Sequence, residues 1–466
     1  VLEQAEYWRS RYHVVVANPP YMGGSGMNGR MSSWIKDNYP DSKADLFATF
    51  IERGFELLIK FGYSAMVTMQ SWMFLSSYEK LREKLENTVS IEAMVHMGNM
   101  VMGIAFGTAG TIWHFSKNTS KNGAYCYVDY EDLNDENNPV VFPPHNTRNM
   151  QAYNRSGDCW FFKASADDFK KIPGSPIAYW VSGDMRRCYE KGTVISQKIK
   201  TAIGLNTGDN NRFLRIWYEV AYKICFSANS IESAIKMKMK WFPYNKGGNY
   251  RKWYGNKEYI INWENDGAEI KEYAVVRNNG RHWSRYIQNL DWMFKRGITW
   301  TFISSSNFGV RLQDPGSLFD VAGSCAFISD NENSTELLLG LLCSKLAFEF
   351  LKVQNPTLNI QAGNVGNIPW IIPKESNTIV LNVNKLIEIE KNDWNSFETS
   401  WEFRINPLAN ERNTNAYLSS IYELLLQKWK YEITNVKLAE EENNRIFIET
   451  FGLQDELSPE VPLSEI

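Results

Sequence analysis

The sequence lacks the patterns that mark membrane, secreted and metal-binding proteins. It has no apolar run of the roughly 18 residues that a membrane helix needs, and no signal peptide precedes the first expected strand. Its 6 cysteines form no CxxC pair and combine with no histidine in a metal-ligand spacing. These absences favour a reduced, cytoplasmic protein with no membrane partner and no bound metal.

The sequence also carries little net charge. The formal charge is -3 over 466 residues, and the hydrophobic content of 44% and charged content of 22% are those of a globular protein. This length predicts about two or three domains. Local charge is uneven, because residues 241–300 are basic and aromatic while residues 431–466 are acidic. Local charge, and not the total, bears on nucleic-acid binding.

The most informative pattern is the tetrapeptide Asn18-Pro19-Pro20-Tyr21, which follows the Val-rich residues 13–17. Such a run predicts a strand buried on both faces of a parallel sheet, with the tetrapeptide at its carboxyl end, where ligands of open α/β sheets bind. The two prolines fix φ and donate no backbone hydrogen bond, so we expect carbonyl oxygens beside the Asn18 amide. The tetrapeptide therefore predicts a rigid pair of hydrogen-bond acceptors.

A pair of acceptors suits an exocyclic amine. The Asn18 side-chain oxygen and the Pro19 carbonyl can hold both N–H groups and favour a pyramidal nitrogen whose lone pair faces an electrophilic methyl group, while Tyr21 offers a flat surface to the base. The motif resembles the catalytic tetrapeptide of amino-methyltransferases that use S-adenosylmethionine, above all the adenine-specific DNA enzymes. The alternative is a proline-rich turn after a core strand.

Residues 22–29 are rich in glycine and formally satisfy G-x-G-x-x-G through Gly24, Gly26 and Gly29. A dinucleotide site is disfavoured, because the strand ends before Asn18 and no acidic strand end follows about twenty residues later. We expect a flexible flap over the base pocket instead.

Strands and helices are expected to alternate after this loop. The pattern Ser42-x-x-Asp45 predicts the start of a helix that Gly62 ends, and residues 76–87 predict a second helix. Strands are expected at residues 63–69, 91–97 and 110–115. This alternation indicates half of a doubly wound α/β sheet.

Longer stretches are similar to the adenine-specific methyltransferase of bacteriophage-exclusion (BREX) systems, often called PglX. The similar stretches are residues 18–28, 34–47, 69–85, 204–217, 241–254, 297–327 and 355–369. This resemblance implies a DNA adenine N6-methyltransferase of a phage-defence or restriction-modification system, which transfers methyl from S-adenosylmethionine to a flipped-out adenine. Asn18, Pro19, Pro20 and Tyr21 would be catalytic, and Asn18 would also contact the cofactor.

In that family a long amino-terminal region with a glycine-rich cofactor loop precedes the tetrapeptide, and this sequence lacks it. We therefore expect the chain alone to be inactive and the first strand to present an uncovered apolar edge. The ending at Ile466 is likewise expected to be cut short.

The second half has features of a DNA-binding domain. A turn-rich loop at residues 204–210 precedes a cation, and aromatic residues then alternate with cations from Trp241 to Trp300. Expected DNA contacts are Arg212, Lys246, Asn249, Tyr250, Arg251 and Lys252. The alternative, favoured for any single tryptophan, is that the aromatics form the core of a β-rich domain and the cations its solvated rim.

These patterns predict an α/β fold class with a partial Rossmann-like methyltransferase sheet in residues 1–117. A connecting region at 118–200 and an α+β target-recognition domain at 201–372 would follow. Residues 334–354 predict one apolar helix, and residues 355–361 resemble the closing segment of target-recognition domains. The mostly helical residues 373–466 are acidic, which suggests a spacer or interaction arm without direct DNA contact.

The expected partners are double-stranded DNA and other proteins of the defence system. A methyltransferase of RNA or of a protein amide would need the same acceptor geometry, but the large basic and aromatic second half disfavours it. A non-catalytic DNA-sensing or assembly subunit that retains the fold is a second alternative.

Overall fold

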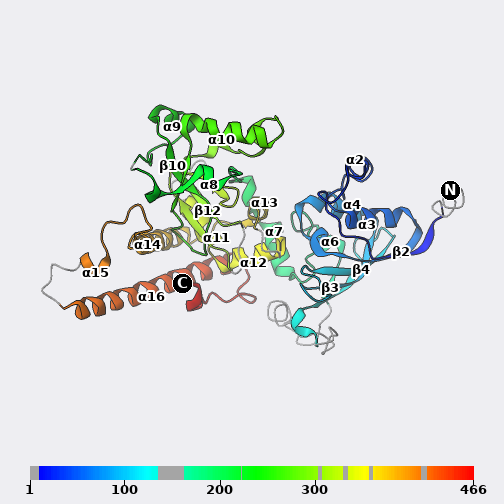
Figure 1. Cartoon of the computed structure of the whole chain (residues 1–466). Coiled ribbons are helices and arrows are strands. Elements are labelled where there is room, and N and C mark those ends of the chain that lie inside the picture. Colours follow the sequence, from blue (N-terminus) through cyan, green and yellow to red (C-terminus); the bar gives the residue numbers. More distant parts are fainter. Residues whose placement is uncertain are drawn as a thin grey trace. The chain divides into compact units, whose positions relative to one another are not determined.

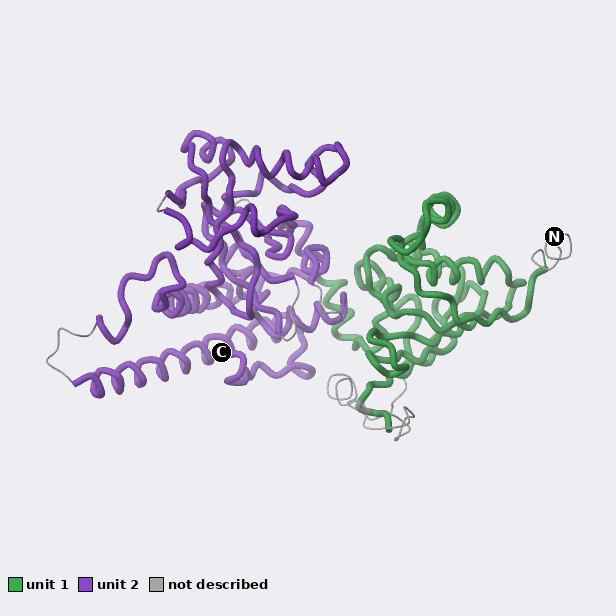
Figure 2. Tube along the Cα trace, viewed as in Figure 1, with its two compact units in different colours: residues 1–191 green, residues 192–466 purple. Residues whose placement is uncertain are grey.

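The computed structural model describes residues 10–134, 162–221, 223–302, 307–328, 334–355, 360–410 and 417–466. The chain divides into two compact units, Val1–Lys191 and Gly192–Ile466 (Figure 2). The first unit is an α/β domain, and the second combines small sheets with long helices (Figure 1). The expected α/β fold class with a helical carboxyl-terminal region is confirmed.

The first unit alternates strands with helices along the chain. Its elements are β1 (Tyr12–Ala17), α2 (Gly29–Asn38), α3 (Leu46–Glu56), β2 (Leu58–Met69), α4 (Glu79–Thr88), β3 (Ser90–Met97), β4 (Thr108–His114), β5 (Gly123–Val128), β6 (Phe162–Ala164), α6 (Ala166–Phe169) and α7 (Gly183–Lys191). Short 3₁₀ turns at Gln70–Met73 and Ser76–Tyr78 lie between β2 and α4.

The strands of this unit form a six-stranded sheet in the order β1-β2-β4-β3-β5-β6. β1 runs parallel to β2 and β3 runs parallel to β5, whereas β4 is antiparallel to both of its neighbours. Helices α3 and α4 lie along the sheet (Figure 1) and bury apolar side chains such as Phe47, Ile51 and Leu81. The sheet is therefore mixed, with its parallel pairs at β1–β2 and β3–β5.

Strand β1 is at the edge of the sheet, and our prediction that it is buried on both faces was wrong. Val14 is 56% exposed and Val16 is 75% exposed. Among the described residues β2 is the neighbour of β1, so the other backbone edge has no partner strand there. The apolar edge that we expected is thus present.

The helix expected to run to Gly62 is shorter than predicted. The Asp45 side chain caps α3 by accepting from the backbone N–H of Phe47 at 3.3 Å, and the chain enters β2 at Leu58. Gly62 lies inside β2, where a Cβ would come within 2.9 Å of the His13 carbonyl oxygen. The glycine therefore permits close pairing with β1 and does not end a helix.

The sheet also continues beyond residue 117, where we expected the catalytic half to end. β5 pairs in parallel with β3, with Val95 opposite Cys126, and β6 pairs with β5. Much of the region expected to be a connection thus belongs to the first unit. The chain between these two strands lies partly outside the described residues, at 135–161.

The second unit contains short strands followed by longer helices. Its elements are β7 (Thr193–Val194), β8 (Lys200–Ala202), α8 (Asn210–Phe213), β9 (Leu214–Ile216), α9 (Ile231–Met237), β10 (Trp241–Asn245), β11 (Tyr259–Asn262), α10 (Glu264–Arg277), β12 (Gly297–Trp300), β13 (Val310–Gln313), β14 (Leu318–Phe319), β15 (Cys325–Phe327), α11 (Ser334–Leu342), α12 (Lys345–Gln354), α13 (Ala362–Gly366), β16 (Pro369–Trp370), α14 (Ser376–Trp394), α15 (Pro407–Asn410) and α16 (Leu418–Phe451).

Two four-stranded sheets, β14-β10-β11-β9 and β13-β12-β15-β8, form the β part of this unit. Large aromatic side chains fill its interior. Trp253, Trp263 and Trp300 are each at most 1% exposed, and Tyr244 and Tyr254 are also buried. The alternative that single tryptophans of this region are core residues is confirmed for these three, whose large rings are buried among the aliphatic side chains of the core.

Helices dominate the rest of the second unit, as expected. The predicted single helix at 334–354 is broken into α11 and α12 at Ser344, whose hydroxyl caps α12. The expected closing segment falls partly on residues 356–359, outside the described residues. Helix α14 packs against α16, where the Asn382 side chain donates to Asn443 at 3.0 Å. No helix in the described ranges combines the length and apolarity needed to cross a membrane.

Candidate functional site

Residues 18–21 directly follow β1 at its carboxyl end. Ala17 pairs with Met66 of the parallel strand β2, so the tetrapeptide lies at the edge of the sheet where β2 also ends. Asn18 is exposed, and within the described residues no hydrogen bond engages its carboxamide. Pro19 is buried while Pro20 is exposed. The Asn18 carboxamide therefore has its donors and its acceptor available at this edge of the sheet, and the buried Pro19 anchors the backbone next to it.

Tyr21 is held by two aromatic neighbours. Its ring meets Phe47 of α3 edge-on at 6.0 Å between ring centroids and meets Phe106 at 5.8 Å. Its hydroxyl donates a long hydrogen bond of 3.4 Å to the Val67 carbonyl oxygen, and burial raises the pKa of the phenol. Because the ring is only half-buried, part of its surface remains accessible beside Asn18.

The glycine-rich segment after the tetrapeptide is tied down at its start. The Met22 N–H donates to the Asp45 carboxylate at 2.9 Å, and the Met22 carbonyl accepts from Leu46 at 3.0 Å. Gly24 donates to the Ala44 carbonyl at 3.3 Å. These bonds fix the first residues of the segment beside the start of α3, which differs from the free flap that we expected.

A second glycine-rich segment, residues 98–107, connects β3 to β4 at the same edge of the sheet. It supplies Phe106, which contacts Tyr21, and exposes Met100 and Met102. Sequence reasoning did not identify Phe106 as a site residue. The sequence did contain a signal: Phe106 lies in the connection between an expected strand that ends, and one that begins, at the edge of the sheet where the tetrapeptide lies.

Asn18 is also the residue expected to contact S-adenosylmethionine. The Asn18 carboxamide suits this role, because it is exposed and makes no hydrogen bond in the described part of the chain. It therefore offers one acceptor and two N–H donors to an amine or to the cofactor.

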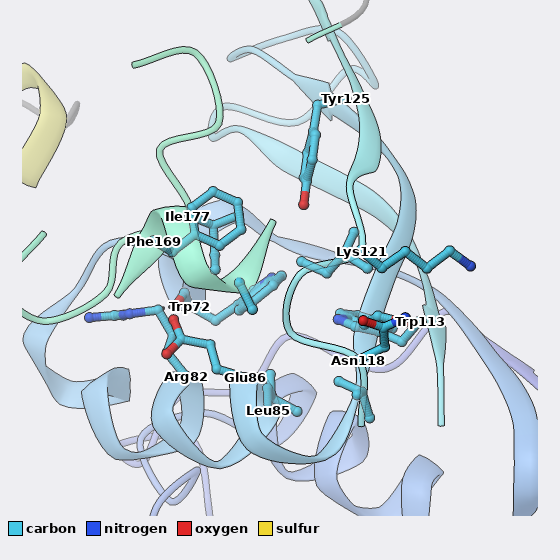
Figure 3. Close-up of a pocket in the computed structure, with 14 residues that line it drawn as sticks. Trp72, Arg82, Leu85, Glu86, Trp113, Asn118, Lys121, Tyr125, Phe169 and Ile177 are labelled. Atoms are coloured by element: carbon cyan, nitrogen blue, oxygen red, sulfur yellow. Dashed lines mark hydrogen bonds between the residues drawn. The ribbon is translucent and has the colours of Figure 1, made fainter. Parts of the chain in front are cut away.

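A separate small cavity lies near the other end of β4 (Figure 3). Three of its lining atoms, Glu86 Oε1, Ser90 Oγ and Trp113 Nε1, are buried without a hydrogen-bond partner among the described residues. Burial raises the pKa of Glu86 to about 7. The cavity volume of about 20 Å³ suits one ordered water and excludes a base or a cofactor.

Lys252 does not fit our prediction of a phosphate contact. Its ammonium is buried and forms an ion pair of 2.5 Å with Glu440 on α16, while the same carboxylate accepts from the Trp253 indole at 2.7 Å. Burial alone would lower the pKa of Lys252, but the Glu440 carboxylate raises it above its ordinary value. The Lys252 charge is therefore neutralised by Glu440 inside the second unit and is not available to a DNA phosphate.

Tyr250 and Arg251 are also engaged within the second unit. Arg251 lies 3.2 Å from the Asp393 carboxylate and 3.7 Å from that of Glu390. The Tyr250 hydroxyl donates to the Glu465 carbonyl at 3.4 Å, and burial raises its pKa to about 12. Since the acidic carboxyl-terminal region binds both side chains, they are poor candidates for DNA contacts.

The other expected DNA contacts are more accessible. Asn249 is exposed, and the Arg212 side chain is 47% exposed although it pairs with Glu269 at 2.9 Å. Lys246 lies with its ammonium 4.8 Å from the centre of the Tyr259 ring, and the described residues offer it no ion pair within 4.0 Å. These three residues remain candidates.

Lys246 lines an open groove of about 410 Å³ on the second unit. A second cation, Arg215, is fixed there because its Nη1 donates to the backbone carbonyls of Asn211 and Leu214, each at 2.6 Å. The remaining lining residues are Asn210, Ile216, Glu219 and Tyr259. The groove thus brings two cations together with an aromatic ring and amide side chains, and sequence reasoning had not placed Arg215 in it.

Comparison with known proteins agrees with the expected resemblance. Residues 2–101 match the family of the Eco57I restriction-modification methylase. The chain is 38% identical over 98% of its length to the adenine-specific methyltransferase BrxX of Escherichia coli O9:H4 (strain HS), and 36% identical over 97% to PglX of Lacticaseibacillus casei (strain Zhang). It spans 35% and 37% of the lengths of these two relatives.

Among solved structures, the type IIL restriction-modification enzyme MmeI in complex with DNA resembles this chain with a TM-score of 0.54. The likeness covers 94% of this chain and 54% of that enzyme, at 14% sequence identity. It shows a shared fold. The resemblance to adenine-specific methyltransferases of the BREX type is thereby confirmed from sequence.

Proposed function

We propose that this chain carries the base-binding edge and a DNA-binding part of a site-specific DNA adenine N6-methyltransferase of a BREX or restriction-modification system. The observation that carries the proposal is the exposed Asn18 carboxamide, unpaired within the described residues, at the carboxyl end of β1. Because the chain covers about a third of its curated relatives, the activity is proposed for the complete protein.

The tetrapeptide would bind a flipped-out adenine through its amino group. The Asn18 Oδ1 accepts one N–H, the Pro19 carbonyl accepts the other, and Tyr21 provides an accessible ring surface for the base. Flipping costs a few kcal/mol, which two hydrogen bonds and one stacking contact largely offset. The two acceptors orient the nitrogen lone pair, so rate acceleration arises from orientation and proximity.

Asn18 would contact bound S-adenosylmethionine, which would supply an electrophilic methyl group to the amine nitrogen that Asn18 Oδ1 and the Pro19 carbonyl hold; the electrons of the carbon–sulfur bond would remain on sulfur. The methylated nitrogen would then carry one proton too many, which would pass to solvent. The exposure of Asn18 is consistent with this step, because water reaches the atoms that hold the amine. No protein nucleophile is required.

The second unit would contact the DNA backbone. The groove lined by Lys246 and Arg215 offers two cations to phosphate groups, and Asn249 and Arg212 are accessible elsewhere. The names of the relatives specify adenine, which favours DNA over a protein amide as the substrate.

The test is methylation of double-stranded DNA by the full-length protein that contains this chain. Asn18→Ala should lower kcat by at least about hundredfold, since both the acceptor and the orientation of the amine are lost. Tyr21→Phe should retain most activity, because its hydroxyl makes one long hydrogen bond. Asn87→Ala, an exposed position on α4, is the matched control. Unchanged methylation in Asn18→Ala would refute the proposal.

A further inference from the structure

The edge of the sheet beside the tetrapeptide is supported by a buried chain of hydrogen bonds. His96 of β3 is 3% exposed and lies between two side chains. Its Nε2 is 2.6 Å from Gln70 Oε1, and its Nδ1 is 3.1 Å from the Tyr179 hydroxyl. Because Gln70 Oε1 can only accept, Nε2 carries the hydrogen, and Nδ1 of the neutral ring accepts from Tyr179.

The surroundings of His96 keep the ring neutral and in place. Burial lowers its pKa to about 3. Four aromatic rings pack around it, those of Phe74, Tyr127, Tyr179 and Trp180, with centroids 4.9 to 6.4 Å away. The direction of the Nε2–H is therefore fixed, and with it the carboxamide of Gln70.

Gln70 in turn fastens the end of the 98–107 segment. Its backbone N–H donates to the Gly107 carbonyl at 3.0 Å. Its side chain lies flat against Gly107, since a Cβ there would meet Gln70 Cδ and Nε2 at 2.5 Å and Oε1 at 2.7 Å. The next residue back is Phe106, whose ring contacts Tyr21.

We propose that Gln70, oriented by His96, is a positioning residue that sets the place of Phe106 and thereby of Tyr21 at the methylation site. Gln70 does not need to touch the substrate. It acts through the tightly packed contact with Gly107, which transmits a displacement of the carboxamide to the neighbouring aromatic residue. This inference rests on the proposed function and assigns a role to residues outside the tetrapeptide.

The first experiment measures kcat and KM for DNA methylation by the full-length protein. Gln70→Ala should lower kcat roughly ten- to hundredfold with KM for DNA within about twofold, because it disturbs the geometry and removes no DNA contact. Gln70→Glu retains an oxygen acceptor for His96 of the same reach and should keep most of kcat. Lys80→Ala, an exposed position on α4, controls for unspecific effects.

The second experiment tests the contact between Gln70 and Gly107. Gly107→Ala alone should lower kcat, whereas Gly107→Ala added to Gln70→Ala should cost nothing further, because the three nearest atoms that the new methyl meets all belong to Gln70. Melting temperatures of all variants show whether each is folded. If Gln70→Ala does not fold, Gln70→Glu and Gly107→Ala carry the test.

A folded Gln70→Ala with kcat within about twofold of the parent, or effects of Gly107→Ala that multiply with those of Gln70→Ala, would overturn the inference. Measuring Asn18→Ala in parallel distinguishes a failure of the positioning role from a failure of the proposed function. If Asn18→Ala abolishes methylation and the Gln70 variants do not affect it, only the positioning role fails. If Asn18→Ala retains methylation, the proposed function fails.

Discussion

The Lys252 ammonium and the Glu440 carboxylate form a buried ion pair of 2.5 Å between positions separated by 188 residues. The pair links the basic and aromatic segment to α16. Trp253 donates to the other oxygen of the same carboxylate at 2.7 Å, so both oxygens of Glu440 are satisfied by this segment. The acidic helical region is thus a structural partner of the cations that composition alone assigns to DNA.

Removing one member of this pair should destabilise the second unit. Lys252→Met leaves the Glu440 charge buried without its cation, and the free energy of unfolding should fall by about 3–5 kcal/mol. Urea unfolding followed by tryptophan fluorescence measures the loss. In the double variant Lys252→Met/Glu440→Gln most of the loss should be recovered, because a neutral amide can still accept from Trp253. Additive losses would contradict the buried-pair interpretation.

Lys246 should contribute to DNA binding through charge alone. Replacing it by alanine is expected to weaken binding by a similar factor for all DNA sequences and to reduce the slope of log K against log salt by about 1. Binding of the full-length protein to DNA at several salt concentrations gives the slope. Lys430→Ala, an exposed cation on α16, should leave the slope unchanged. An identical slope for Lys246→Ala and the parent would remove the groove from the DNA-binding surface.

Glu86 should make the stability of the first unit depend on pH. Burial raises its pKa from 4.5 to about 7 in the folded state, against a hydrogen bond with Ser175 and the charges of Lys170 and Arg82, and the Glu83 charge raises it further. The folded chain therefore holds the Glu86 proton more tightly than the unfolded chain. The contribution of this proton to the free energy of unfolding is complete below about pH 4.5 and is lost as pH rises through about 7.

The variant Glu86→Gln should remove this dependence. Its free energy of unfolding at pH 8 should exceed that of the parent by about 1–3 kcal/mol, since a neutral amide needs no proton in the buried site. Glu190→Gln, at an exposed position on α7 and not among the charges that act on Glu86, is the control. Chemical unfolding at pH 5 and pH 8 provides the comparison, and a gap between parent and Glu86→Gln that does not widen at the higher pH would argue against the assignment.

The sequence predicted the position of the candidate site well, because the signals are local. A Val-rich run followed by Asn18-Pro19-Pro20-Tyr21 specifies a strand and its carboxyl end within ten residues. The burial of that strand was mispredicted, since exposure depends on which elements lie beside it. Gly62 was misread for a similar reason: its role is set by the His13 carbonyl of another strand and not by its neighbours in sequence.

The candidate DNA contacts were harder to predict because cations look alike in a sequence. Lys246 and Lys252 are six positions apart in one segment, yet one lines an open groove and the other is buried in an ion pair. The partners of Arg251 and Lys252 come from α14 and α16, far along the chain. Phe106 and Gln70 were missed because their proximity to Tyr21 or Gly107 arises only when the strands assemble.

The shared carboxylate of Glu440 also limits how such proteins can be re-engineered. A chimera made by grafting only residues 201–372 from a relative would separate Lys252 and Trp253 from the acceptor that satisfies both. In the chimera, the buried Lys252 ammonium and the buried Trp253 indole would pack against the recipient's own helix, which need not offer a carboxylate at that position. Chimeras should therefore move α16 together with the β-rich part, or restore an acidic residue at the matching turn of the recipient.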